Sequence, residues 1–524
     1  MEDTKYTLKK KLNTIKDLIQ AKLVEFTVPS IAVGLARNGE ILLEEGFGWA
    51  DCENKILANK NTIYSLASVS KPITATGIMI LKERGMIDLD RPINDYLGDT
   101  KVKVWVGNPE EVTVRRVLNH SSGLPLHYQF FCKDEKYPKP PMDETIKRYA
   151  NVITIPGEKY IYSNIGYGIL GYIIYRLSGK SYPDFMREEV FTPLNMKHTT
   201  VYLNPRLGKY LAVHYASDGL PIPFYDFDHP GASAVLSSVH DLLKFGMFNL
   251  KAHLLEQKTI ISDKIIDEMQ KPTVKISNGD YSAGPEEQKY FKPYRGCGWQ
   301  INKDEMGYCT VRHGGDMCGV SAQFVMIPSE KLVVVVLLSK SLYSLSCQII
   351  QEILSIILPE YGNNYALLET RKKKEKVVVE TVINEQKEPE IKHSFSPSIK
   401  LIGKWMGKVY SYNGEIPFTI WSKESGDVFA QLGGQLKTLL CDVSFENSYL
   451  RGKMAGDIGT EDANRRIYYL QLELKLRNQI LNGSIIAISD DVWLPERRLG
   501  NALSHWVELK KQTIKKFTKF ELAR

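Results

Sequence analysis

The sequence lacks any long apolar run. Its longest uninterrupted run is LVVVVLL, which begins at Leu332 and is far shorter than the about 20 residues that a membrane-spanning helix needs. Its β-branched residues are typical of a buried strand. The N-terminal stretch MEDTKYTLKKKLNTIKDLIQAKL has no continuous apolar segment either. Its leucine and isoleucine spacing predicts an amphipathic helix over residues 9–24 and not a signal peptide. We therefore expect no membrane association and a cytoplasmic protein.

Metal and cofactor motifs are also missing. The cysteines are odd in number and scattered, and no two form a CxxC pair, which argues against zinc and thioredoxin-like sites and suits a reducing compartment. The seven cysteines are Cys52, Cys132, Cys297, Cys309, Cys318, Cys347 and Cys441. The sequence contains no HxH, HExxH or GxxxxGK[ST] pattern. We expect no metal and no cofactor.

The sequence has no dense basic stripe with interleaved aromatic residues, which a nucleic-acid surface needs. The net charge of +7 is mild for 524 residues. Lysine-rich stretches occur at 371–376 and 510–519, and we interpret them as a solvated linker and a solvated tail. We expect no binding to nucleic acid.

The length predicts more than one domain, because single hydrophobic cores stop growing at about 250–300 residues. Strand-like runs lie at both ends of residues 1–365, with helical patterns between them. This order predicts an α+β domain in which an antiparallel sheet is assembled from both ends and helices pack on it. A charged segment poor in aromatics, residues 366–395, predicts a linker. Residues 396–524 alternate apolar and polar residues between Gly and Asn turns, which predicts an all-β sandwich or barrel.

Local signals place the elements of the first domain. Asn38-Gly39 between two strand-like runs predicts a hairpin. Gly85 and Pro359 each mark the end of a helix, and Ser237 or Ser238 is expected to cap another. Further helices are predicted at 71–87, 112–125, 165–181, 237–250 and 346–361, and strands at 307–315, 321–329 and 331–340.

The stretch SLASVSKPITATGIMI sets Ser68 three residues before Lys71, at the start of a predicted helix. Residues three apart on a helix share a face. A serine hydroxyl is a poor nucleophile until a base takes its proton, and a lysine can be that base if burial or a positive field lowers its pKa. The S-x-x-K spacing therefore predicts an activated serine, although alone it is also compatible with a capped helix and a solvated lysine.

Two later motifs strengthen this interpretation. In YSN, Tyr162 can share the proton transfer with the lysine, and Asn164 offers a donor and an acceptor to the lysine and a substrate amide. In HGGD, which runs from His313 to Asp316, Gly314 and Gly315 let substrate backbone approach closely. The backbone N–H groups of Asp316 and Ser68 are then candidates for an oxyanion hole.

The order S-x-x-K, Y-x-N, H-x-G resembles the serine β-lactamase and penicillin-binding protein superfamily, most closely the class C β-lactamase branch with its esterase and D-peptidase relatives. The stretches VTVRRVLNHSSGLP, PGEKYIYSNIGYGILGYIIYRLSGKSYPDFM and GCGWQI are also similar to that branch. The resemblance covers roughly residues 10–360. It implies an antiparallel sheet with flanking helices, an all-helical insert, and an active site between them.

The resemblance also implies roles for the site residues. Ser68 is the acylated nucleophile, Lys71 and Tyr162 share the proton transfers, and Asn164 orients Lys71 and the substrate. His313 stands where most β-lactamases carry the lysine of a K-T-G triad. A histidine with an ordinary pKa near 6.5 is mostly neutral at pH 7. Recognition of a substrate carboxylate should therefore weaken, which favours ester, amide or peptide substrates.

The resemblance leaves β-lactamase, D-peptidase or carboxypeptidase, and carboxylesterase activity open, with a small molecule or a peptide as substrate. A second hypothesis is a catalytically silent scaffold on the same fold. The C-terminal module resembles lipocalin-like barrels fused to some members of this superfamily, in IGKWMGKVYSYNG above all. We expect it either to cap the active site or to form a homo-oligomer surface.

Overall fold

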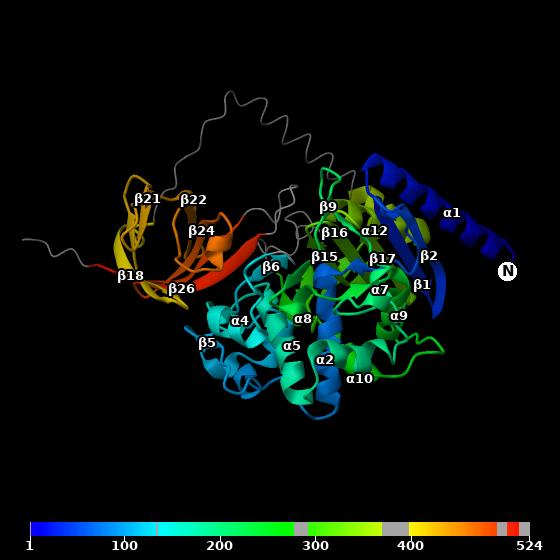
Figure 1. Ribbon diagram of the computed structural model, residues 1–524, viewed down its shortest axis with the longest axis horizontal. Helices are drawn as coiled ribbons and strands as arrows, with labels where there is room; N and C mark the ends of the chain where they lie inside the picture. Colours follow the sequence, from blue (N-terminus) through cyan, green and yellow to red (C-terminus); the bar gives the residue numbers. More distant parts are fainter. Residues whose placement is uncertain (1, 133–134, 277–291, 369–397, 490–499, 513–524) are drawn as a thin grey trace, which may run out of the picture. The chain divides into compact units, whose positions relative to one another are not determined.

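A computed structural model of the chain describes residues 2–132, 135–276, 292–368, 398–489 and 500–512 (Figure 1). These residues form two compact units, one mainly from before and one mainly from after the charged segment. Most of the predicted linker, residues 369–395, lies outside the described residues, as do 371–376 and 513–519 of the lysine-rich stretches. Residues 366–368, which we assigned to the linker, are helical.

The first unit contains a nine-stranded sheet that combines both ends of the predicted domain. Strand β1 (Ser30–Arg37) pairs antiparallel with β17 (Leu332–Leu338) on one side and with β2 (Glu40–Asp51) on the other. Ile31 lies opposite Leu338, and Arg37 lies opposite Glu40. The predicted hairpin at Asn38-Gly39 is confirmed. In sheet order the strands are β12 (Val274–Lys275), β13 (Pro293–Arg295), β14 (Gln300–Glu305), β15 (Tyr308–Met317), β16 (Val320–Ile327), β17 (Leu332–Leu338), β1 (Ser30–Arg37), β2 (Glu40–Asp51) and β3 (Ile56–Leu57).

Helices cover both faces of this sheet. On one face α1 (Glu2–Glu25) and α12 (Tyr343–Ile357) share a buried apolar cluster with alternate residues of the central strands, including Ile31 and Val33. On the other face lies α9 (Val239–Asn249), close enough that a Cβ at Gly34 would lie 3.0 Å from Leu243. The alternation along β1 is the period of two that a strand covered on both sides requires.

The remaining helical part lies between the N-terminal and C-terminal strands, as expected. Its longest helices, α2 (Ser70–Glu83) and α5 (Asn164–Ser178), begin at two of the predicted motifs. Gly85 closes α2 at a φ of 70°, and the cap of α9 is Ser238, whose side chain accepts from the backbone N–H of Asp241. The other helices are α3 (Val114–Leu118), α4 (Met142–Tyr149), α6 (Tyr182–Met186), α7 (Pro205–Gly208), α8 (Pro230–Ser233) and α10 (Asp263–Met269).

Short elements complete the first unit. Its single-turn helices are η1 (Ala67–Val69), η2 (Ile93–Asp95), η3 (Pro109–Glu111), η4 (Arg187–Phe191) and η5 (Pro328–Glu330). Its small strands are β4 (Tyr64–Ser65), β6 (Tyr128–Cys132), β7 (Asn151–Val152), β8 (His214–Tyr215), β9 (Pro221–Ile222), β10 (Tyr225–Phe227) and β11 (Leu236–Ser237). A further small strand, β5 (Lys103–Val104), belongs to the second unit. The predicted helix at 112–125 is shorter than expected, because α3 ends at Leu118 and His120 adopts a φ of 63°.

The second unit is a nearly closed, barrel-shaped antiparallel sheet. The strands at the two ends of its sheet order, β21 and β22, follow each other directly in the chain, so the sheet curls back on itself. The strand order is β21 (Thr438–Leu439), β20 (Val428–Leu432), β19 (Gly414–Ser422), β18 (Gly403–Ser411), β26 (Asn501–Lys511), β25 (Ile480–Ile488), β24 (Tyr469–Arg477), β23 (Tyr449–Met454) and β22 (Cys441–Glu446), with the turn η6 (Ala463–Arg465).

Among the described residues of both units, no helix is long and apolar enough to cross a membrane.

Candidate active site

Ser68 lies in the short helix η1, directly before α2. The preceding residue, Ala67, has a φ of 47°, a conformation that non-glycine residues rarely adopt and that often marks functional sites. Backbone hydrogen bonds hold the turn, from the N–H of Leu66 to the carbonyl of Val235 and from the N–H of Val69 to that of Leu66. Ser68 is partly exposed, whereas both of its neighbours are buried. The turn therefore presents one hydroxyl at the surface of a packed core.

Lys71 is fully buried one turn later, as the sequence argument required. Its Nζ lies 3.0 Å from Ser68 Oγ and donates to the carbonyl oxygen of Ala232 at 3.1 Å. Burial, together with the positive charge of Arg295, holds the pKa of Lys71 well below its ordinary value. The neutral amine has a lone pair that can take the Ser68 proton.

Tyr162 completes the set around the serine. Its hydroxyl donates to Ser68 Oγ at 2.7 Å, and its ring centroid lies 4.7 Å from Lys71 Nζ. Burial raises the pKa of Tyr162, although Arg295 and the hydrogen bond to Ser68 lower it in part. The resting pair is therefore a neutral tyrosine and a lysine biased toward the neutral amine. The lysine is the better base of the two.

Asn164 lies at the first position of α5, and its side chain differs from expectation. We expected it to hold Lys71, but the carbonyl of Ala232 takes that hydrogen bond. Among the described residues, Asn164 Oδ1 is buried and has no hydrogen-bond partner. This oxygen is available to a substrate N–H group.

His313 and the two glycines after it bring strand β15 against the serine turn. A Cβ at Gly315 would lie only 2.3 Å from the carbonyl oxygen of Leu66 and 3.0 Å from the backbone nitrogen of Ser68. The four residues of HGGD are therefore next to the nucleophile, where an oxyanion hole is expected. The side chain of Asp316 accepts hydrogen bonds from Ser321 and Ser341, and burial raises its pKa to about 6.

The His313 imidazole is buried and neutral. Its Nδ1 lies 2.7 Å from the carbonyl oxygen of Gly314, which can only accept, so Nδ1 carries the proton. Burial and the charges of Arg295 and Lys71 hold the pKa of His313 well below 6.5. The Nε2 atom has no partner among the described residues. The group that replaces the usual lysine is thus an uncharged acceptor.

The sequence analysis missed two residues of this site, His120 and Arg295. The Nδ1 atom of His120 accepts a hydrogen bond from the backbone N–H of Ser163, and its ring centroid lies 4.6 Å from that of Tyr162. His120 therefore supports the YSN motif. Arg295 is buried beside Tyr160 and Tyr162. Both residues lie in or beside stretches already noted, LNHSSGLP and GCGW, but nothing in one sequence separates them from structural residues.

A buried cluster of two histidines and an aspartate lies behind Lys71. In His127, Asp228 and His229, the side-chain atoms that could bind a metal lie within 4.8 Å of one another. The spacing of the histidines in the sequence did not predict this cluster. Each histidine lies within hydrogen-bond distance of one Asp228 oxygen, at 2.8 and 2.6 Å. Burial raises the pKa of Asp228, but the two histidines lower it overall. The cluster is explained by these hydrogen bonds, and it anchors the start of α8, whose residue Ala232 holds Lys71.

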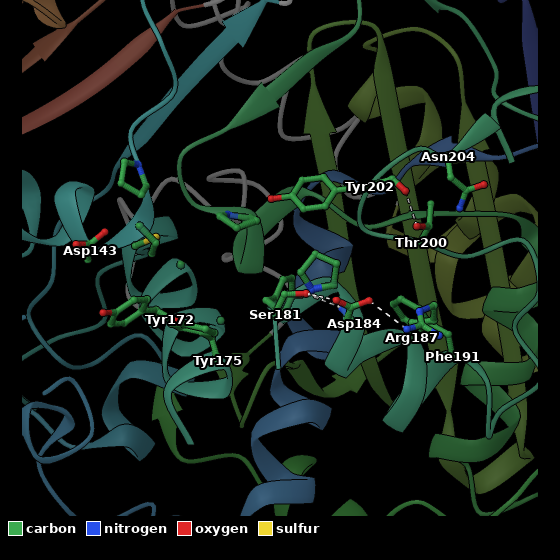
Figure 2. A pocket seen from close by; sticks show the side chains of 17 residues that line it. Asp143, Tyr172, Tyr175, Ser181, Asp184, Arg187, Phe191, Thr200, Tyr202 and Asn204 are labelled. Carbon is green, nitrogen blue, oxygen red and sulfur yellow. Dashed lines mark hydrogen bonds and ion pairs between the residues drawn. The ribbon is translucent and has the colours of Figure 1, made fainter. Parts of the chain in front are cut away.

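One cavity of the first unit is separate from this site. Figure 2 shows its lining, which includes Tyr172 and Tyr175 of α5, Tyr202, and the hydrogen-bonded group of Ser181, Asp184 and Arg187. Its volume is about 730 Å³. None of the residues around Ser68 lines it.

Geometry and charge together bring a buried lysine amine and a tyrosine hydroxyl within hydrogen-bond distance of the Ser68 hydroxyl. Residues 15–346 match the family model described as Beta-lactamase, which spans more than half of the chain. The chain belongs to the beta-lactamase family of serine hydrolases, which includes penicillin-binding proteins.

Individual relatives agree with this assignment. The chain is 30% identical to Penicillin-binding protein 4* of Bacillus subtilis (strain 168) over 379 residues, which are 66% of this chain and 76% of the relative. It is 26% identical to Protein flp of Staphylococcus aureus (strain MW2) over 333 residues, 62% of each chain.

Solved structures support the fold. A class C beta-lactamase superposes with a TM-score of 0.54 at 20% identity, over 66% of this chain and 96% of that one. The octameric penicillin-binding protein homologue from Pyrococcus abyssi superposes with a TM-score of 0.52 at 23% identity and covers 95% of this chain and 100% of that one.

Proposed function

We propose that the chain cleaves an amide, peptide or ester bond through an acyl-enzyme on Ser68. The observation that carries the proposal is the arrangement at Ser68 Oγ, which lies 3.0 Å from the amine of a buried lysine and 2.7 Å from a tyrosine hydroxyl. A carboxylic ester or amide is the substrate class that such a nucleophile attacks. Because His313 is neutral, substrates without a carboxylate next to the scissile bond are favoured.

In the first step Ser68 Oγ attacks the substrate carbonyl carbon while its proton passes to Lys71, directly or through the hydroxyl of Tyr162. The carbonyl oxygen becomes an oxyanion, which the backbone N–H groups of Ser68 and Asp316 stabilise. The carbon–leaving-group bond then breaks, and the proton held by Lys71 moves to the departing amine or alcohol. The product of this step is an ester of Ser68.

In the second step a water molecule attacks that ester. The neutral Lys71–Tyr162 pair takes the proton of the water and returns it to Ser68 Oγ, which releases the acid product. Asn164 offers its free Oδ1 to a substrate N–H group in both steps. Peptidase, D-peptidase and esterase activities all follow this sequence: peptidases release an amine and differ in the stereochemistry they accept, whereas an esterase releases an alcohol.

The test measures the mass of the intact protein after incubation with a fluorophosphonate probe, with Ser68→Ala treated in the same way as the control. One adduct on wild type and none on the variant is the expected result. An adduct of equal yield on both proteins contradicts Ser68 as the nucleophile. No adduct on wild type at any pH favours the alternative, a silent binding scaffold, which the intact serine, lysine and tyrosine argue against.

For the C-terminal barrel, which resembles lipocalin-like modules, we propose a role in self-association or in capping the site. The homologue from Pyrococcus abyssi, which is octameric, aligns over 95% of this chain. Light scattering after size-exclusion chromatography measures the mass of the particle directly. A monomeric mass excludes the first role and leaves capping. A cytoplasmic location also stays a prediction.

A further inference from the structure

Arg295 is a buried cation at the candidate site. It is the last residue of β13, opposite Gln300 of β14, and its side chain is only 3% exposed. Its Nε–H donates to the hydroxyl of Tyr160 at 3.2 Å. In the part of the chain that the structure describes, no carboxylate forms an ion pair with it. Burial of a guanidinium without an ion pair costs free energy, so packing alone does not account for this residue.

The groups around Arg295 are those of the proposed mechanism. Its guanidinium carbon lies 5.5 Å from the ring centroid of Tyr160 and 5.7 Å from that of Tyr162. The amine of Lys71 lies 4.7 Å from the same Tyr162 ring. The Arg295 guanidinium and the Lys71 amine thus both lie near one aromatic ring, whose hydroxyl donates a hydrogen bond to Ser68.

Further titratable groups face this pair from other elements. They come from the loop after α3, from α5, from the residue before α8, and from β15, and they are His120, Tyr167, His229 with its partner Asp228, and His313. The one carboxylate among them, Asp228, is held between His127 and His229. Among these groups, the Arg295 guanidinium is therefore the one that keeps a positive charge throughout the working pH range.

We propose that Arg295 is a positioning residue that supplies, from β13, the positive charge that His313 does not carry, and that it acts through Tyr162 and Lys71 and not on the substrate. This inference rests on the proposed function. A nearby cation disfavours the ammonium form of Lys71 and favours a developing tyrosinate at Tyr162. Both effects ease removal of the Ser68 proton. A guanidinium that is buried and bonded to Tyr160 does not reach a substrate carboxylate.

The variants that test this are Arg295→Gln and Arg295→Met, which remove the charge, and Arg295→Lys, which keeps it. The acid limb of kcat/KM, or of the rate of fluorophosphonate labelling, should move to higher pH by about one unit in the two neutral variants. The rate above that limb should stay within about threefold of wild type. In Arg295→Lys the limb should stay in place. A merely structural role lowers the rate at every pH and leaves the limb where it is, which would overturn the proposal.

A second measurement does not depend on turnover. In protein carrying ¹³C at the lysine ε position, the signal of Lys71, assigned with Lys71→Arg, titrates with the protonation of its amine. The proposal expects a Lys71 pKa well below that of an ordinary lysine in wild type, and a rise in the neutral variants. An ordinary value in wild type refutes the proposal even when neither neutral variant folds. A lowered value that Arg295 controls, in a protein that no probe labels, supports the electrostatic role while the proposed function fails.

Discussion

Gly315→Ala tests how closely strand β15 must approach the serine turn. A Cβ at this position would lie 2.3 Å from the carbonyl oxygen of Leu66 and 3.0 Å from both Ala67 Cβ and Ser68 N. Two of these three atoms belong to the backbone, so they cannot turn away as the end of a side chain can. The backbone conformation of Gly315 itself is one that alanine can adopt, because its φ is not in the left-handed region. Any effect therefore comes from the close approach.

The size of the effect follows from the distances. To restore an ordinary contact, the strand and the turn must separate by roughly 1 Å, and forcing an extra methyl into a packed interior costs about 1–3 kcal/mol. A misplacement of about 1 Å in a catalytic arrangement lowers the rate by about 100-fold. We expect a loss of stability in that range together with a loss of about 100-fold in fluorophosphonate labelling of Ser68.

Gly314→Ala is the matched control. It adds the same methyl group one residue earlier, on the opposite face of the strand, where the nearest atom is the hydroxyl oxygen of Tyr343 at 2.5 Å. The end of a tyrosine side chain can shift more easily than a backbone carbonyl. We expect labelling within about threefold of wild type. Urea unfolding and labelling rates of both variants, measured side by side, give the comparison.

Labelling of Gly315→Ala at the wild-type rate, with unchanged stability, would refute the reasoning. It would mean that β15 does not need to lie against the turn of Ser68. Equal losses in the two glycine variants would assign the effect to the strand as a whole and not to the contact with the turn.

Three further predictions concern single side chains. Tyr162→Phe removes the hydrogen bond to Ser68 and should lower kcat/KM by about 10²–10⁴-fold with an unchanged melting temperature; a normal rate would leave Lys71 as the sole base. His313→Lys should increase the rate of acylation by benzylpenicillin by about tenfold, since it restores a charge for the carboxylate; no increase would show that the missing cation does not set substrate choice. Glu305→Gln should cost about 3–5 kcal/mol of unfolding free energy at pH 7, because it removes the buried ion pair between Glu305 and Arg312. Burial raises the pKa of Glu305, but Arg312 and several hydrogen bonds lower it overall, so this stability is present above its unfolded pKa of about 4.3 and is lost as the pH falls through the folded pKa. Urea unfolding at pH 7 and at pH 4 should therefore show a difference between Glu305→Gln and wild type that shrinks at the lower pH, and a constant difference would contradict the charge argument.

Local sequence signals predicted most of the elements that carry the site. The hairpin at Asn38-Gly39, the helix end at Gly85 and the serine cap of α9 depend on turn and cap chemistry within a few residues, and all three are confirmed. The sheet built from both chain ends followed from the order of strand-like and helix-like runs. Strand order inside the barrel did not follow, because alternation specifies a face but not a partner.

The candidate site was predicted in part, for a physical reason. Ser68 and Lys71 are neighbours on one helical turn, so their spacing alone brings them together. Tyr162 and His313 meet them only through the fold, and the order of the family motifs was needed to select them. Arg295 has no such motif, and its role depends on which rings surround it. The partner of Lys71 was also misjudged, because the carbonyl of Ala232 belongs to a backbone turn that no side-chain pattern marks.

The replacement of lysine by His313 separates two tasks that one cation can perform. A lysine at this position can both bias the proton transfers at the serine and meet the carboxylate of a substrate. Here the first task has a second source, since Arg295 lies beside the Tyr162 ring from a different strand. The second task, binding the substrate carboxylate, has no cation at position 313. The imidazole there is neutral, and its Nε2 can only accept a hydrogen bond. On the proposed function, such a site keeps an activated serine while it loses the attraction for a carboxylate next to the scissile bond. A donor on the substrate, such as an amide N–H or a hydroxyl, is the group that suits both the Nε2 of His313 and the Oδ1 of Asn164.

Paired substrates that differ only in a carboxylate or its methyl ester should therefore differ little in kcat/KM or favour the ester. A preference of tenfold or more for the free acid would show that a cation still reaches the substrate.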